Sequence, residues 1–289
     1  MKNLYPLTSD SFTYFENIIK AKRKHRKPIL EALSDDIKLL YQEYGANISA
    51  LELLTPTSLN AEQKEALQHC YLVPVQTMYE LRHDIEVHQI TCNADIAAFC
   101  QYCGLNYGAK TLDHYLPKDI FAEFSTLALN LVPCCVDCNT LKDTAWLKGS
   151  EREIISFYYD SLPTTQFLFA DLAKTGNVYK PSFHLSLDAS DYCGMEATIR
   201  GHFNKLDLLN RYADASAPVI SEQQGLIESI ATEHIIAGLG FDDEEIIDLI
   251  VHILTKNAVK LGNNLSINHW KVPLYQSISA NRNFIKSCI

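Results

Sequence analysis

The chain has 289 residues, of which 47% are hydrophobic, and its formal net charge at pH 7 is −10. This composition is typical of a folded protein with a sizeable core and excludes global disorder. An acidic chain does not bind phosphate backbones over its whole surface, so any contact with nucleic acid must be local.

The first part of the chain, residues 1–95, is expected to form a helical region. Apolar residues recur at helical spacing from Phe12 to Tyr44, and Ser9 or Asp10 can cap the first helix. Lys27-Pro28 is expected to interrupt this stretch, because proline disfavours helix at the residue before it.

Two further helices are expected in the same region, one over 59–70 with Asn60 as its cap and one over 77–88. The densest run of positive charge in this acidic chain is Lys20–Lys27. It could grip phosphates, or it could be a solvated helix face near a surface break, and the sequence leaves both interpretations open.

The nine cysteines bear on the redox state of the compartment and on whether the thiols bind metal. Nine is an odd number, the first residues lack the apolar core of a signal peptide, and no apolar run reaches the length of a membrane span. We therefore expect a cytoplasmic protein without membrane contact. In a reducing compartment, clustered cysteines bind metal more often than they form disulfides.

The region 96–150 is expected to contain a zinc site built from two CxxC pairs. The four candidate ligands are Cys100, Cys103, Cys135 and Cys138. Two such turns complete a tetrahedral four-thiolate site, and a site without an open position for water is structural. Gly104 follows the first pair, where a turn favours positive φ. Cys134 could replace Cys135, although the CxxC spacing favours Cys135.

Residues suited to phosphodiester chemistry lie between and just after the two cysteine pairs. Asp113 and His114 place a hard oxygen ligand beside a titratable nitrogen base. Asn130 precedes the second pair, and Asn139 and Lys142 follow it. Hydrolysis of a phosphodiester needs a nucleophile near neutral pH and neutralisation of charge on the phosphoryl oxygens, which a histidine and a divalent ion can supply.

The region 151–289 is expected to be helical. Segments 151–173, 198–213 and 219–238 carry apolar residues at helical spacing. Phe241 to Glu245 indicates a helix start, because acidic residues in a first turn favour the positive end of the helix dipole.

Three short motifs of the central region resemble the HNH endonuclease family, also called His-Me finger nucleases, in its zinc-bound form. They are LDHYLPK at 112–118, NLVPCC at 130–135 and CN..K at 138–142. The resemblance implies a mainly α-helical protein with an inserted zinc-stapled ββα-metal finger at 96–150. It covers only this part of the chain.

The resemblance also implies residue roles. His114 would be the general base that activates water, and Asp113 and Asn139 would hold Mg²⁺ or Mn²⁺. Asn130 would fix the hairpin loop and orient His114, and Lys142 would face a phosphate or the leaving group. The family's third motif residue is usually histidine, whereas this chain has Asn139. An asparagine carbonyl can still bind a hard cation.

The expected function is therefore metal-dependent cleavage of nucleic acid, with DNA favoured and RNA possible. The alternative is a non-catalytic zinc module that binds nucleic acid or a protein partner. With the segment FYYD.LP..QFLF after it, the finger is similar to the HNH subunits of Septu and certain retron antiphage systems. This similarity implies a defence role beside an ATPase. No GxxxxGK[ST] loop occurs here, so the ATPase would be a separate subunit.

Tyr102, Tyr107 and Tyr115 lie near the finger motifs. They could stack on nucleic-acid bases, but packing around a small core explains them equally well.

Overall fold

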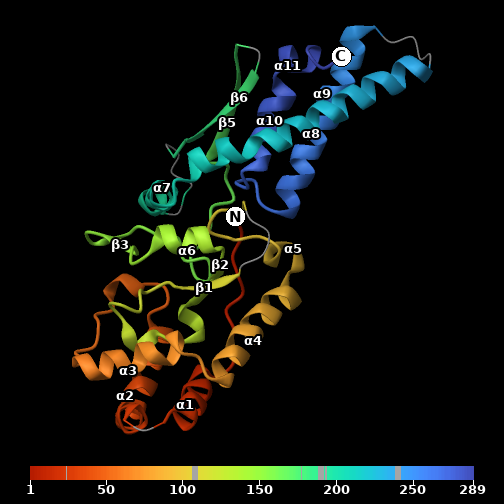
Figure 1. Cartoon of the computed structure of the whole chain (residues 1–289). Coiled ribbons are helices and arrows are strands. Elements are labelled where there is room, and N and C mark those ends of the chain that lie inside the picture. Colours follow the sequence, from red (N-terminus) through yellow and green to blue (C-terminus); the bar gives the residue numbers. More distant parts are fainter. Residues whose placement is uncertain (24, 106–109, 177, 188–191, 193, 238–241) are drawn as a thin grey trace. The chain divides into compact units, whose positions relative to one another are not determined.

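The computed structural model is mainly helical, and its described residues contain three separate two-stranded antiparallel sheets (Figure 1). The described residues are 1–23, 25–105, 110–176, 178–187, 192, 194–237 and 242–289. The chain divides into two compact units. The site unit comprises 2–161 and 197–206, and the C-terminal unit comprises Met1, 162–196 and 207–289.

The site unit holds the N-terminal helices and the region of the cysteine pairs. Its helices are α1 (Ser11–Ala21), α2 (Arg26–Ala46), α3 (Ala61–Leu72), α4 (Gln76–Cys92), α5 (Ala94–Ala97), α6 (Val136–Lys142) and most of α7 (Glu196–Lys205). Its strands are β1 (Thr111–His114), β2 (Leu131–Cys134), β3 (Leu147–Lys148) and β4 (Glu151–Arg152). Three short 3₁₀ turns, Leu51–Leu53, Ala122–Phe124 and Ala128–Asn130, complete it.

The N-terminal helices begin where the capping residues predict. Asp10 accepts a hydrogen bond from the Phe12 amide at 3.0 Å at the start of α1, and Asn60 forms a capping box with Gln63 on α3. Helix α1 ends at Ala21 and α2 begins at Arg26, so the interruption comes earlier than the expected Lys27-Pro28. Pro28 lies instead in the first turn of α2, where the backbone N–H that proline lacks has no partner within the helix.

A short antiparallel pair and one helix form the centre of the site unit. Strand β1 pairs with β2 so that Asp113 lies opposite Val132 and His114 opposite Leu131. Helix α6 follows β2 at once and packs against β1. A two-stranded pair is marginal alone, and here it is packed against helices. Because the two strands are antiparallel, the start of β1 lies beside the start of α6, and Lys142 at the end of α6 reaches Asp113 and His114 at the end of β1.

Tyrosine hydroxyls from the N-terminal helices tie this centre to the rest of the unit. Tyr44 on α2 donates to Asn130 Oδ1 at 3.3 Å, and Tyr71 on α3 donates to the Leu112 carbonyl at 2.9 Å. Because buried hydroxyls need partners, these bonds fix where the helices and β1 meet.

The C-terminal unit combines a long β-ribbon with packed helices. Its elements are β5 (Leu168–Thr175), β6 (Val178–Leu185), α8 (Leu208–Ala237), α9 (Asp243–Asn264), α10 (Lys271–Ala280) and α11 (Arg282–Lys286). The expected helix start is confirmed, since Asp242 caps α9 and forms a capping box with Glu245. Phe241, also part of that prediction, lies outside the described residues.

The prediction of helix over 151–173 was wrong. This segment contains β4, a stretch of turns and most of β5, which pairs with β6 over eight residues. Leu168 and Leu172, which lie on one face of β5, are buried, whereas Asp171 and Ala173 on the other face are exposed. Gly176 has φ of 61°, and the dipeptide Gly176-Asn177 is a hairpin signal in the sequence. Asn177 itself lies outside the described residues.

The compact units divide the chain differently from the three regions expected at 1–95, 96–150 and 151–289. The cysteine pairs share one unit with the N-terminal helices, and the main boundary lies at 161–162. None of the helices in the described part of the chain has both the length and the apolar composition needed to cross a membrane.

Candidate functional site

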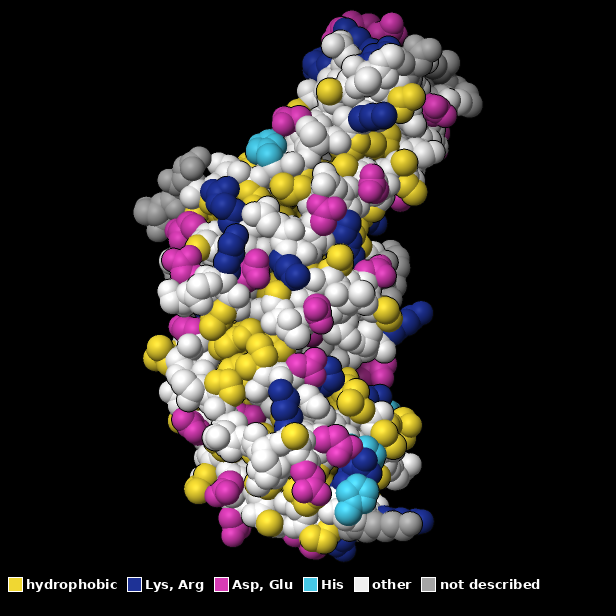
Figure 2. Space-filling model, turned by 60° about the vertical axis from the view of Figure 1, so that its left-hand side comes forward, with side chains coloured by type: hydrophobic (Ala, Val, Ile, Leu, Met, Phe, Trp, Pro, Cys, Tyr) yellow, Lys and Arg dark blue, Asp and Glu magenta, His cyan; other side chains and the backbone are white. Residues whose placement is uncertain are grey.

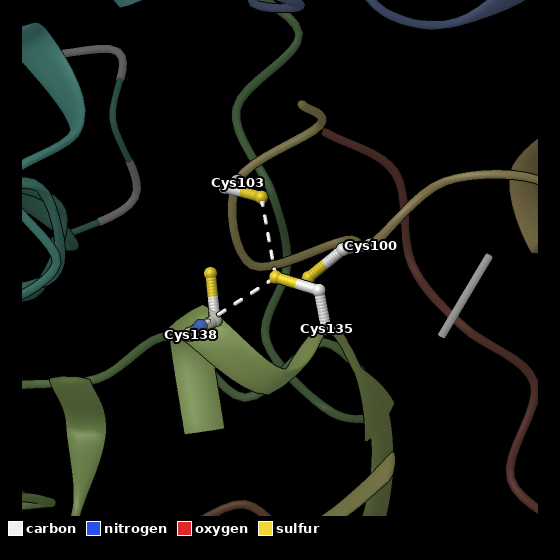
Figure 3. A group of neighbouring side chains, drawn as sticks. All are labelled: Cys100, Cys103, Cys135 and Cys138. Atoms are coloured by element: carbon white, nitrogen blue, oxygen red, sulfur yellow. Dashed lines mark hydrogen bonds between the residues drawn. The ribbon is translucent and has the colours of Figure 1, made fainter. Parts of the chain in front are cut away.

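Four buried cysteines converge in the site unit (Figure 3). Their sulfur atoms all lie within 4.8 Å of one another. Cys100 and Cys103 come from the loop before β1, and Cys135 and Cys138 come from the start of α6. Gly104 follows the first pair with φ of 69°, as its position predicts. Among the described residues, this is the one group of three or more His, Cys, Asp or Glu side chains whose ligand atoms converge.

The spacing of the cysteine sulfurs is compatible with a structural zinc ion. The Sγ atoms of Cys103 and Cys135 lie 3.9 Å apart. A tetrahedral ion with Zn–S bonds of about 2.3 Å places its sulfurs about 3.8 Å apart. Backbone amides also point at the sulfurs: Leu105 N lies 3.4 Å from Cys103 Sγ, and Cys138 N lies 3.5 Å from Cys135 Sγ. Such donors stabilise thiolates.

Cys134 lies outside the cluster, which removes the ambiguity left by the sequence. Its side chain is buried at the end of β2, and burial raises the pKa of its thiol well above the ordinary value. Cys135 caps α6 and is the member of the pair that joins the other three cysteines.

A buried ion pair lies beside the cysteine cluster. The Lys142 ammonium is fully buried, and its Nζ lies 2.9 Å from Asp113 Oδ2 and 3.2 Å from Asp113 Oδ1. It also donates to the His114 carbonyl at 2.9 Å. Tyr102, which stands between the two cysteines of the first pair, donates its hydroxyl to Asp113 Oδ2 at 2.8 Å. The carboxylate is therefore held from both sides by donors.

This geometry corrects the role expected for Lys142. A side chain with no exposure, whose ammonium is bound to a carboxylate and a backbone carbonyl, does not face a phosphate. Its observed contacts fix the carboxylate of Asp113 and the backbone of His114. The burial of Lys142 follows from the packing of α6 on β1, which the motif spacing does not reveal.

His114 ends β1, and the surrounding residues fix its orientation. Its Nε2 lies 3.0 Å from the Ser125 carbonyl oxygen, which can only accept, so Nε2 carries the proton and Nδ1 carries the lone pair. No hydrogen bond to Nδ1 occurs within the described residues. The Tyr71 ring packs edge-on against the imidazole, with centroids 4.3 Å apart. The side chain is held in the form that a general base requires.

Burial lowers the pKa of His114 to about 3, because the charged imidazolium is poorly solvated there. The imidazole is therefore neutral at physiological pH, although it is a weaker base than an exposed histidine. An anionic phosphate beside the ring would raise this pKa toward the operating range.

Asn130 lies at the base of the β1–β2 connection and is fully buried. Its amide nitrogen donates to the Leu116 and Phe124 carbonyls, and its Oδ1 accepts from Leu116 N at 2.8 Å. Its own carbonyl accepts from Tyr115 N at 2.9 Å, directly after His114. These bonds are what a loop-fixing asparagine would make.

A small polar pocket of about 170 Å³ opens at the end of β1. Asp113 and His114 line it from the strand, and Asn139 lines it from α6. The Asn139 amide nitrogen donates to Thr111 Oγ1 at 2.7 Å, which leaves its carbonyl oxygen available for a cation. The volume admits several water molecules or a hydrated ion. The structure thus brings together the three residues expected to act on the substrate.

Asp143 also lines the pocket and was not singled out by sequence reasoning. It ends α6 with φ of 50° and ψ of −123°, a sparsely populated combination for a residue with a side chain. The exposed carboxylate adds negative charge at the rim. Tyr102 was considered only for packing or base stacking, and its position inside a CxxC pair is the signal that could have placed it near Asp113.

The basic run Lys20–Lys27, a candidate phosphate-binding surface, is partly buried and partly paired with other residues. Within Lys20–Lys27, Lys22 is buried against His69 and Val73, and Arg26 pairs with Glu65 at 2.7 Å. The run is therefore not a continuous basic face, and Lys24 lies outside the described residues. Figure 2 shows acidic and basic side chains interspersed on the face that it presents.

The described tyrosines near the cysteine pairs are buried rather than exposed to a ligand. Tyr102 and Tyr115 are buried, with exposed fractions of 0% and 1%, so neither can stack on a base. Tyr107 lies outside the described residues.

A buried histidine behind the cysteine loop predicts acid sensitivity. His202 donates to the Tyr102 carbonyl at 2.8 Å, and burial lowers its pKa to about 4. The unfolded chain binds a proton near pH 6.5, so stability is full above that pH and is lost as pH falls toward 4. At pH 5 this histidine alone costs about 2 kcal/mol.

The measurement is urea unfolding of the wild type and of His202→Gln at pH 7, 6 and 5. The variant is expected to be less stable at pH 7 but to lose less stability on acidification. An equal pH slope in both proteins would contradict the assignment.

Comparisons with known proteins add one relative. Protein ea31 of Escherichia phage lambda is 26% identical over 194 residues, which are 65% of this chain and 63% of that protein. The chain thus spans less than two thirds of the relative's length, and that protein's name describes no activity. No family model and no solved structure matches the chain.

Proposed function

We propose that this protein is a metal-dependent nuclease of the HNH type, in which His114 is the general base. The observation that carries the proposal is the orientation of His114: the Ser125 carbonyl holds Nε2, which leaves the lone pair on Nδ1, and the residue lines a polar pocket. Asp113 and Asn139 line the same pocket from two elements, in the order strand, strand, helix expected of the family.

The residues of the pocket fit a hard divalent cation. Asp113 offers a carboxylate and Asn139 a free amide oxygen, and Mg²⁺ prefers a few such oxygens together with water. When bound, the ion would neutralise charge on the phosphoryl oxygens. His114 would take the proton from the attacking water at Nδ1, while Ser125 keeps the ring from rotating. Lys142 and Tyr102 would hold the Asp113 carboxylate in position through their hydrogen bonds to it.

The second candidate function is a zinc module that binds nucleic acid or protein without cutting. Its support is the cysteine cluster alone, which is compatible with zinc whether or not the pocket is catalytic. A non-catalytic module gives no reason for the oriented histidine or for a strained aspartate at the pocket rim.

The test compares cleavage of plasmid DNA, single-stranded DNA and total RNA in Mg²⁺ or Mn²⁺. His114→Ala is expected to slow cleavage by about 10²–10⁴-fold or more, because a positioned base is lost, with zinc content unchanged. His83→Ala, which removes an exposed histidine from α4, is the matched control and keeps full activity. Equal cutting by wild type and His114→Ala would refute the role of His114. Retained binding without any cutting by wild type would favour the zinc module.

The biological setting is proposed from the resemblance to the Septu and retron nucleases. It predicts a separate ATPase subunit as a partner and a role in antiphage defence. Co-purification from the native host, followed by the cleavage assay on the complex, tests this part independently of the isolated chain.

A further inference from the structure

A second cavity, of about 410 Å³, opens in the site unit and contacts the same strand as the polar pocket. Thr111 and Leu112 of β1 line it, whereas Asp113 and His114 line the polar pocket. Tyr71 lines the cavity as well, and its ring packs against His114. The cavity and the polar pocket are separate, but β1 lines both of them, and Tyr71, which lines the cavity, contacts His114 of the pocket.

The walls of the cavity are mainly apolar and come from several elements of the site unit. The apolar lining includes Leu4, Ile90, Ala97, Phe99, Leu112 and Pro133. A volume of this size is within the range of sites for small organic ligands, about 300–1,000 Å³.

Two cationic side chains stand at this apolar space in an otherwise acidic protein. The Arg82 guanidinium lies 4.7 Å from the centre of the Tyr71 ring, and its Nε is buried with no hydrogen-bond partner among the described residues. Lys110, just before β1, is exposed and forms no ion pair with a described residue. Glu86 is the acidic residue of the lining, so the balance of charge is positive.

An apolar cavity with an aromatic wall and two cations matches the chemistry of a nucleotide. The faces of a base are apolar and stack on aromatic rings, and a phosphate pairs with arginine or lysine. A base in a duplex has its faces covered by neighbouring bases, so only an unpaired base can enter such a cavity.

The cavity lies next to the proposed cleavage site along β1. Leu112 and His114 lie two residues apart along β1, which is about 7 Å. This distance is close to one step between successive phosphates of an extended single strand. We propose that the cavity beside Tyr71 and Arg82 holds an unpaired nucleotide of the strand being cut, adjacent to the phosphate at His114. This inference rests on the proposed nuclease function and names its substrate as a strand with unpaired bases.

The test measures binding rather than cutting, so that the two proposals can fail separately. Full-length His114→Ala, with its zinc content verified, is titrated in Mg²⁺ into labelled single-stranded DNA, single-stranded RNA of the same sequence, and the DNA duplex. The cavity is then changed with Ile90→Glu, which places a negative charge at its wall. Ile90 is 50% exposed, so this change is compatible with folding.

Val87→Glu is the matched control. Val87 lies on the same helix, is 44% exposed and does not line the cavity. Ile90→Glu is expected to weaken binding of a single strand by about tenfold, roughly the loss of one stacked base. Val87→Glu is expected to change it by less than about twofold, because it adds the same charge elsewhere. Duplex binding is expected to be weaker than single-strand binding and equal in both variants.

An oligonucleotide of abasic sites separates recognition of the base from recognition of the phosphate. It is expected to bind about tenfold more weakly than the normal strand and to show no further loss with Ile90→Glu. Three results would overturn the inference. The first is an equal loss of binding with Ile90→Glu and Val87→Glu, and the second is no measurable binding of single strands. The third is saturable binding of free AMP together with no effect of Ile90→Glu on the binding of strands. Cavity-dependent binding in a protein whose wild type never cuts would keep the nucleotide site and refute the nuclease.

Discussion

Cys135→Ser is expected to abolish zinc binding and to unfold the centre of the site unit. Structural zinc contributes about 10–16 kcal/mol in small zinc domains, which matches or exceeds the total stability of about 5–15 kcal/mol typical of a folded domain. The pair β1–β2 has four residues per strand, and the first turn of α6 begins at the cysteine cluster, so a zinc ion there would join the loop before β1 to the start of α6.

The measurement combines metal analysis with fluorescence of Trp146. The chain has two tryptophans, and in a Trp270→Phe background the signal comes from the site unit alone. Cys134→Ser is the control, because Cys134 is the neighbouring cysteine and lies outside the cluster. It is expected to keep one zinc per chain. Zinc retained by Cys135→Ser and lost by Cys134→Ser would show that the ligands are assigned wrongly.

Lys142→Met is expected to lower the free energy of unfolding of the site unit by about 3–5 kcal/mol. Removing one partner of a buried ion pair leaves the other charge without compensation, and the Asp113 side chain is 4% exposed here. The methionine fills a similar volume, so the loss is electrostatic rather than a cavity effect. Lys148→Met, at an exposed lysine of β3, is expected to change stability by less than about 0.5 kcal/mol.

A double variant identifies the cause of this loss. Lys142→Met combined with Asp113→Asn removes both charges and keeps an acceptor for the Tyr102 hydroxyl, so it is expected to recover most of the lost stability in urea unfolding. A double variant as unstable as the sum of the two single variants would show that the charges do not interact.

The parts of the site that the sequence could predict are those set by neighbouring residues. The CxxC spacing predicted the cysteine cluster and the positive φ of Gly104, Asn60 as a cap predicted the start of α3, and acidic residues of a first turn predicted the start of α9. Each CxxC pair, the turn at Gly104 and each helix start depends on residues a few positions apart, and the preference of zinc for four ligands is what joins the two pairs.

The parts that the sequence did not predict depend on contacts between distant segments. Lys142 was placed toward the substrate because its distance from Asn139 matched a motif, but its burial depends on how α6 packs on β1. The carbonyl of Ser125 carries no side-chain signal, so nothing in the sequence pointed to it as the group that orients His114. The β5–β6 ribbon was missed because helical periodicity was given more weight than strand alternation and a Gly-Asn turn.

The tyrosine hydroxyls of the N-terminal helices mean that the segment 96–150 does not hold its own structure independently of those helices. Tyr44 and Tyr71 supply bonds to Asn130 and to the backbone of β1 from outside the segment 96–150. A chimaera that carried only this segment would keep the four cysteines but would lose the hydrogen bond of Tyr44 to Asn130 and the contact of the Tyr71 ring with His114. If the proposed site is to work in another protein, the N-terminal helices must therefore be transferred together with the motifs, because a match to the motifs alone does not reveal whether those helices are present.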